Sequence, residues 1–203
     1  LSGNVNATVG TVTITADSAA QDTAADTDGA ITRASGTVTA ATATLSAATG
    51  IGGSGTIEVN LTTLTSAAVS GTGSIDISDT AGGLTVTNAT TSNGGITLAA
   101  VGGTLSVAAA TAGTGGNMLY TADEIELTGA ANSIVGTGTI TLRPETVGQN
   151  IEVAGTGGTA ALDLTAAELG KLANGFSGIT IGRADGTGLV TVNAVTFNDP
   201  ITI

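Results

Sequence analysis

The sequence contains no cysteine and no histidine, and only three of its 203 residues are aromatic. Because cysteine is absent, no disulfide framework forms and cysteine pairing says nothing about the redox compartment. The lack of both residue types excludes Ser-His-Asp and Cys-His nucleophilic catalysis and the usual zinc sites. Aromatic side chains normally supply much of a core's buried area. The scarcity of aromatics therefore predicts an interior narrow enough for Ile, Val, Leu and Ala to fill.

Positive charge and long apolar runs are also scarce. Four Lys and Arg residues stand against 16 Asp and Glu residues, which gives a formal net charge of -12. A surface of this sign repels nucleic acid phosphates and anionic lipids. Gly, Thr and Ser interrupt every apolar stretch well before the roughly 18 residues that a membrane helix needs. We therefore expect no nucleic-acid partner and no membrane insertion.

The sequence is rich in one short pattern, in which a polar residue stands between two apolar ones. The stretch "GITLAAVGGTLSV" contains it at residues 96–98 and 105–107, and equivalent triplets at 75–77 and 84–86 come 21 residues earlier. Such alternation predicts short strands with one buried face. Glycine turns such as "TAGG" and "GTGG" separate the strands. The other triplets are residues 12–14, 57–59, 125–127, 140–142, 151–153, 162–164, 179–181, 190–192 and 201–203.

Recurrence near 20 residues, with a glycine turn after each strand, is typical of a β-solenoid. We predict an all-β fold, a right-handed parallel β-helix that runs as one continuous segment over residues 1–203. The handedness follows from the general rule for parallel crossovers. At about 4.8 Å per layer, roughly ten coils would form a rod about 48 Å long. The chain starts at Leu1 without an initiator Met or a signal peptide, which we interpret as a piece of a longer or processed protein.

One coil, residues 162–181, carries a helix signature in the stretch "LTAAELGKLANGF". Thr165 and Glu168 have the spacing of a capping box, in which each side chain accepts a hydrogen bond from the other residue's backbone. Gly175 is the predicted C-cap after Asn174. The pattern predicts one short inserted helix over residues 166–174.

A second irregular segment, the acidic loop at residues 17–32, holds the only candidate metal ligands. Asp26 and Asp28 have the spacing of the middle of a calcium-binding EF-hand loop, but the first ligand position is Ala24 and the twelfth is Ser35. The match therefore fails, and a solvated acidic loop is the better interpretation. Calcium is a weak possibility, and otherwise we expect no cofactor.

Paired carboxylates are the remaining route to catalysis, because acids on neighbouring coils can cleave carbohydrates. If successive triplets alternate between two faces, each middle residue points outward and stacks on its equivalent one coil away. No column then holds two acids, so we predict no catalytic residues and no enzyme. The predicted columns are Asp76 with Thr97; Thr85 with Ser106 and Glu126; Thr141 with Asp163 and Thr191; and Glu152 with Thr180 and Thr202.

The same columns bear on ice binding, which needs a flat and regular array of threonines. The stretch "TVTIT" at residues 11–15 suggests such an array, but acids interrupt the predicted columns. Threonine is better explained by its preference for strands and by solubility. Ice binding is therefore the weaker alternative.

The strand repeats resemble those of filamentous haemagglutinin-like proteins, the large adhesins of bacterial two-partner secretion. The most distinctive wording lies between Glu124 and Ile203, with "TGAANSIVGTGTITLRPETVGQNIEVAG" followed by "LDLTAAELGKLANGFSGITIGRADGTGLVTVNAVTFNDPITI". The resemblance implies a right-handed parallel β-helix, export to the bacterial cell surface, and a structural or adhesive role.

The predicted strand at Ile201 to Ile203 is not followed by a polar cap, and uncapped solenoid ends offer strand edges that invite pairing. Our leading hypothesis is a structural segment of an extracellular bacterial fibre or giant adhesin. Its partner is either a second copy stacked end to end or a continuation of the same chain. The alternative is a binding module whose loop 17–32 or helix-bearing coil recognises a glycan or a receptor.

Overall fold

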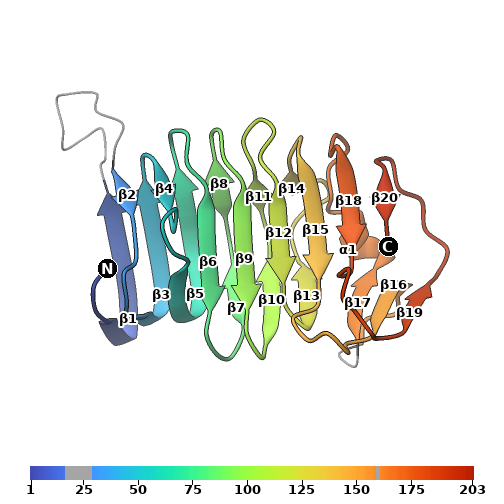
Figure 1. Ribbon diagram of the computed structural model, residues 1–203, viewed down its shortest axis with the longest axis horizontal. Coiled ribbons are helices and arrows are strands. Elements are labelled where there is room, and N and C mark those ends of the chain that lie inside the picture. The colour runs from blue at the N-terminus through green and yellow to red at the C-terminus, as the bar shows by residue number, and fades with distance from the viewer. Residues whose placement is uncertain (17–28, 159–160) are drawn as a thin grey trace.

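The computed structural model describes residues 1–16, 29–158 and 161–203 (Figure 1). In these ranges the chain is nearly all parallel β-strand, with a single short helix. Seventeen strands belong to one sheet, and β16, β17 and β19 form a second. Most of the predicted acidic loop, including Asp26 and Asp28, lies outside the described residues.

From β1 to β15 the coils follow one another along the rod in chain order, but at the C-terminal end β17 lies before β16, and β19 follows β16 (Figure 1). The strands of the N-terminal half are β1 (Val5–Ala16), β2 (Ala30–Ile31), β3 (Val38–Ala47), β4 (Gly50–Ile51), β5 (Ile57–Val69), β6 (Ile75–Asp79), β7 (Leu84–Val86), β8 (Ala89–Thr91) and β9 (Ile96–Ala100). The remaining elements are β10 (Thr104–Val107), β11 (Ala110–Thr111), β12 (Met118–Thr121), β13 (Glu124–Leu127), β14 (Ile134–Val135), β15 (Thr139–Arg143), β16 (Ile151–Gly155), β17 (Leu162–Thr165), α1 (Ala166–Leu169), β18 (Gly178–Ile181), β19 (Val190–Val192) and β20 (Ile201–Thr202).

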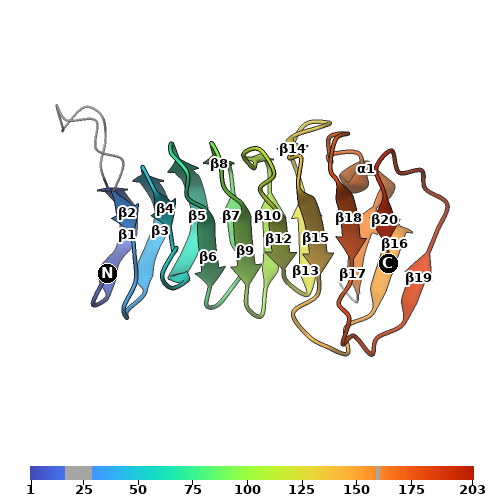
Figure 2. The same cartoon turned by 45° about the horizontal axis from the view of Figure 1, so that its top comes forward.

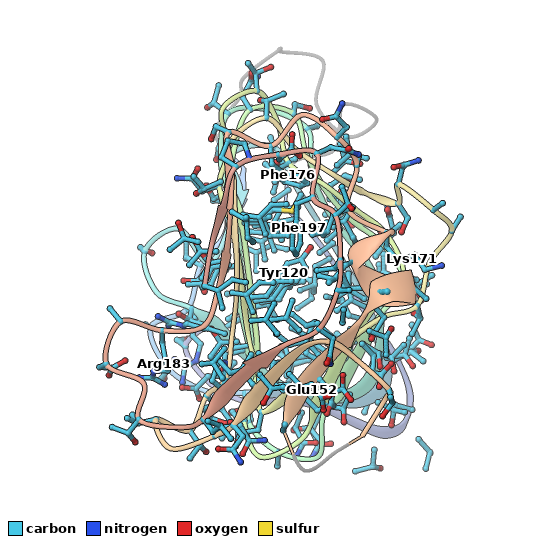
Figure 3. The ribbon with its side chains drawn as sticks, turned by 90° about the vertical axis from the view of Figure 1, so that its right-hand side faces the viewer. Tyr120, Glu152, Lys171, Phe176, Arg183 and Phe197 are labelled. Carbon is cyan, nitrogen blue, oxygen red and sulfur yellow. The ribbon has the colours of Figure 1, made fainter. Side chains whose placement is uncertain are left out.

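Each strand pairs in parallel with an equivalent strand in the next coil. Ile75 pairs with Ile96 and Ile96 pairs with Met118, so one coil takes 21 or 22 residues in the middle of the rod. The view along the long axis shows strands on different sides of a shared interior (Figure 3). The prediction of a parallel, solenoid-like fold is therefore confirmed.

The interior is a single file of apolar side chains contributed by alternate strand positions. In β6 and β9 every second residue is buried, and the aliphatic members of this set are fully enclosed. Tyr120 is the one large aromatic that is completely buried, and its hydroxyl donates only to the Met118 sulfur, 3.6 Å away. Burial raises the pKa of Tyr120 above its usual value. A core this narrow needs few aromatics, as the composition predicts.

Glycines stack at one corner of the rod, where successive coils come closest. A Cβ atom on Gly94 would lie 2.0 Å from the carbonyl oxygen of Gly73, and one on Gly116 would lie 2.1 Å from that of Gly94. Gly138 repeats the arrangement above Gly116, with a distance of 2.5 Å. Only a residue without a side chain allows the two backbones to approach so closely. This column of glycines therefore sets how tightly the coils stack.

The helix-bearing coil begins as predicted but ends differently. Thr165 caps α1 and forms the full capping box with Glu168, so these two assignments are confirmed. The predicted helix over residues 166–174 is wrong in length, because α1 has four residues and its C-cap is Gly170. Gly175, the predicted C-cap, instead has φ 128° and donates its amide proton to the carboxylate of Asp199.

A tertiary strand contact explains why the helix stops early. Leu172 forms a parallel bridge with Ile134 of β14, and the Ala173 amide donates to the Ile134 carbonyl at 2.8 Å. This pairing continues the solenoid ladder and is incompatible with a longer helix. The intrinsic helix propensity of these residues is too small to outweigh the strand contact. With four residues in α1, the described part of the chain has no helix able to span a membrane.

We predict that Gly94→Ala lowers the free energy of unfolding by about 2–4 kcal/mol, because the new methyl group would overlap backbone atoms of the preceding coil. Gly53→Ala is the matched control. Gly53 also lies in a turn, but a Cβ atom there meets no other atom within 4 Å. Its substitution should change stability by less than about 1 kcal/mol. Urea unfolding measures both values, and equal effects would contradict the close stacking at this corner.

Candidate functional site

The outward columns agree with the prediction only as far as β13. Asp76 stacks on Thr97, and Thr85 stacks on Ser106 and then on Glu126, as expected. Beyond this point only the stacking of Thr180 on Thr202 is as predicted, and the other predicted neighbours are wrong. Thr141 stacks on Thr180, and Thr180 on Thr202. Glu152 stacks on Asp163 on one side and on Thr191 on the other.

The prediction that no column holds two acids is therefore wrong, and a change in coil length explains the error. The triplets that begin at Ile140, Ile151 and Leu162 are equally spaced, which suggested regular alternation between two faces. In the structure, β16 and β17 pair directly with each other, so Ile151 lies beside Leu162. The chain returns to the same face after eleven residues. Glu152 and Asp163 thus become neighbours.

The junction between β13 and β17, which we call the seam, differs from the other strand contacts. β17 packs against β13. The ladders of the described residues join β13 to β10 and β17 to β16, but none joins β13 to β17. The Leu127 amide, at the end of β13, donates to Oε1 of Glu168 at 3.1 Å. A side chain of α1 therefore takes the place of a backbone acceptor on a neighbouring strand.

Four carboxyl groups meet at the seam: Glu124 and Glu126 from β13, Asp163 from β17 and Glu168 from α1. Glu124, Asp163 and Glu168 are only 6%, 3% and 7% exposed. Oε2 of Glu168 accepts hydrogen bonds from the amide and the hydroxyl of Thr165, at 2.8 and 2.7 Å. Figure 2 shows that β16, β17 and β19 gather at the C-terminal end of the rod, next to α1.

Three carboxyl oxygens at the seam are buried without a hydrogen-bond partner. Oδ2 of Asp163 accepts from the amides of Gly157 and Gly158, both at 2.8 Å, but its Oδ1 has none. Both Oε atoms of Glu124 are also unpartnered. A buried polar atom without a partner costs free energy, so these atoms need an explanation.

Burial and the repulsion of neighbouring acids raise the pKa values of the two glutamates of β13. Burial raises the pKa of Glu124 to about 7, and the charges of Glu126, Glu168 and Asp163 act in the same direction. The amide of Ile125 partly opposes the shift, although it does not complete a hydrogen bond. Burial and Glu168 also raise the pKa of Glu126. The ion pairs of the described residues lie elsewhere, at Arg33 with Glu58 and at Arg183 with Asp185.

The seam is enclosed, and this limits its chemistry. Acids from neighbouring strands do come together, but three of the four are almost fully buried, so a glycosidic bond has no room between them. In residues 1–16, 29–158 and 161–203, no three acidic side chains are arranged as metal ligands. The chemistry that this geometry directly supports is the gain and loss of protons.

Both ends of the rod expose strand residues that continue the interior. Val190 and Val192 of β19 are in register with the buried Ile151 and Val153, yet both are exposed because no further coil covers them. Ile201 in β20 extends the column of Ile179 in the same way. At the other end, β3 is the one partner of β1 among the described residues, and most inward residues of β1 are half-buried, although Val12 is buried. The predicted structural residues Ile201 and Ile203 thus lie at an exposed apolar edge.

A face of hydroxyl groups covers the first coils. Thr11, Thr42, Thr63, Thr85 and Ser106 occupy successive register positions before Glu126 ends the column. The hydroxyls of Thr11 and Thr42 lie 2.7 Å apart. A parallel column contains Thr13, Thr44 and Ser66. The triplet pattern does not predict the members of these columns before Thr85, because the constant spacing that fixes the register begins at residue 75.

A small hollow lies between α1 and the segment before β20. Leu169, Leu172, Phe197, Asn198 and Asp199 are among its lining residues, and its volume is about 180 Å³. Small-molecule sites usually measure roughly 300–1,000 Å³. The hollow is therefore small for the glycan site that the sequence suggests as an alternative in this coil.

Comparison with known proteins gives no relative from which to transfer a function. No family model, no curated protein and no solved structure matches the chain. The resemblance to filamentous haemagglutinin-like proteins thus stays a prediction.

We predict that Thr165→Ala lowers the free energy of unfolding by about 1 kcal/mol, because the capping box loses its hydroxyl and Glu168 loses a donor. Thr165→Ser keeps the hydroxyl and should retain most of the stability. Urea unfolding of the two variants measures the difference. Equal stability of the alanine and serine variants would show that the cap contributes nothing.

Proposed function

We propose that the chain is a structural segment of an extracellular bacterial fibre or giant surface adhesin, built as a right-handed parallel β-helix. The observation that carries this proposal is the exposed apolar strand edge at the C-terminal end of the rod. Its partner is a further coil, supplied by a second copy or by continuation of the same chain.

The C-terminal edge supports the proposal most directly. Val190, Val192, Ile201 and Ile203 leave apolar surface beside open backbone groups. Proteins normally protect such edges with charge, proline or a covering element, because open edges pair with other strands. Solenoids in particular end in capping repeats with a polar outer face. An unprotected apolar edge is therefore expected in a rod whose last strands pair with a further coil.

The charge of the molecule would direct this association. A net charge of -12 on a chain with only four basic residues makes rods repel one another side by side. The apolar ends attract, so contact is favoured along the long axis. Each added coil then contributes backbone hydrogen bonds in the direction of the rod, which gives the assembly stiffness and resistance to unfolding.

We predict that Val192→Lys weakens end-to-end association roughly tenfold or more, because a buried and unpaired ammonium group is costly at the junction. Val101→Lys is the control. Val101 is 40% exposed and Val192 is 54% exposed, so the same substitution is made at a similarly accessible valine. Val101 lies in a turn in the middle of the rod, away from the C-terminal edge. Sedimentation velocity over a range of concentrations measures the association of the isolated chain. If both variants associate like the unsubstituted chain, the C-terminal edge is not the contact.

The hydroxyl face favours a second candidate function, the binding of ice. In β1 and β3 its side chains repeat at about 4.8 Å between coils and at about 6.7 Å along each strand, whereas a bulge in β5 places Thr63 and Ser66 three residues apart. The strands β1, β3 and the second half of β5 carry no charged residue. A flat, uncharged lattice of hydroxyls holds a layer of ordered water through hydrogen bonds.

If the hydroxyl face binds ice, we predict that the chain inhibits ice recrystallisation. Thr44→Tyr should abolish this inhibition, because the larger side chain disrupts the array of hydroxyl groups. Thr141→Tyr makes the same change in another column and should have no effect. Absence of inhibition by the unsubstituted chain would reject this candidate and leave the structural role unaffected.

A further inference from the structure

The seam interrupts the solenoid on one side only. On the side that contains β13, ladders connect β1, β3, β5, β7, β10 and β13 in an unbroken series, and β17, β16 and β19 form a separate series. On the opposite side, β6, β9, β12, β15, β18 and β20 remain connected past the same level. A junction that is continuous on one side and interrupted on the other has the geometry of a hinge.

The interruption coincides with the buried acids. Glu124 and Glu126 face the junction from β13, Asp163 from β17 and Glu168 from α1. The donors present serve Glu168 and one oxygen of Asp163, while both oxygens of Glu124 have none. Several buried carboxyl groups with like charge cannot all ionise without a large cost in free energy. Protons are the simplest means of removing that cost.

The remaining neighbours do not neutralise the acids. The positions of β10 in register with Glu124 and Glu126 are the uncharged Thr104 and Ser106. On β16, Glu152 lies beside Asp163 and adds a further acid, whose Oε1 accepts a hydrogen bond from the side-chain Nδ2 of Asn193. Lys171, just after α1, takes part in neither ion pair of the described residues.

We propose that the seam is a proton-controlled joint of the rod. With Glu124 and Glu126 protonated, α1 and β17 stay packed against β13. When these groups ionise, the junction opens on this side while the ladder on the opposite side keeps the coils connected. This inference goes beyond the structural role and does not depend on end-to-end association.

The direction of the pH dependence follows from the buried glutamates. The pKa of Glu124 rises from 4.5 to about 7 in the folded chain, and that of Glu126 rises as well. The closed seam therefore binds more protons than the open one. Its stability is complete below about pH 4.5 and is lost as the pH rises through about 7.

Hydrogen exchange measured by mass spectrometry at pH 5 and pH 8, corrected for the intrinsic exchange rates, tests this proposal. We expect protection of residues 125–127 and 162–169 to fall by roughly 70-fold between the two pH values, as one group with this shift requires. Protection of β6 and β9 in the middle of the rod should not change. Equal protection of the seam at both pH values would overturn the proposal, as would an equal loss along the whole rod.

Two variants test whether the pH dependence of protection comes from proton binding by Glu124. Glu124→Gln keeps the size of the side chain without its charge, and should reduce the loss of protection at pH 8 to less than a third of that in the unsubstituted chain. Glu145→Gln is the control, because this side chain binds the amide of Gly102 away from the seam and should leave the pH effect intact. If Glu124→Gln does not fold, Glu126→Gln makes the same test with a smaller expected effect. A different result would be full protection of the seam at pH 8 in millimolar calcium that is lost in Glu124→Gln. This result would mean that the seam binds a cation, and it would overturn the proton-controlled joint.

Discussion

The parallel hydrogen-bond ladder between successive coils is the constraint on which the rest of the structure depends. It places equivalent residues directly above one another at about 4.8 Å. Glycines therefore occur where coils touch, as at Gly73, Gly94 and Gly116, and aliphatic residues fill a core too narrow for many aromatics. The same stacking creates the outward columns and leaves a strand edge exposed at β19 and β20. Shape, core and surface are consequences of one repeated backbone contact.

The seam shows what happens where this contact is not made. A buried amide at the end of a strand still needs an acceptor. Glu168 supplies one for Leu127, and Thr165 holds Glu168 in place through the capping box. The short helix thus replaces a missing strand contact. The replacement brings a further carboxyl group next to Glu124 and Glu126, and this contributes to the raised pKa values at the junction.

The sequence predicts the features that depend on local pattern and constant spacing. Alternation of period two gives the strands and the core, and the Thr165 and Glu168 pair gives the start of α1. The columns from Asp76 to Glu126 are correct because coil length is constant there. Beyond β13 the coil length changes, so constant spacing predicts the wrong register partner for Asp163. The helix is shorter than predicted because Leu172 pairs with Ile134. The seam joins residues that are far apart in the chain, such as Leu127 and Glu168, which are 41 positions apart. No local sequence pattern predicts such a contact.

Electron cryo-microscopy of filaments formed by the isolated chain tests the central claim, that the open apolar ends extend the solenoid, most directly. The proposed role predicts long unbranched rods in which the spacing of about 4.8 Å continues without interruption across each junction between copies. Separate short rods at every concentration would contradict assembly through the ends. Rods joined side by side would contradict it as well, because contact would then occur through the charged flanks.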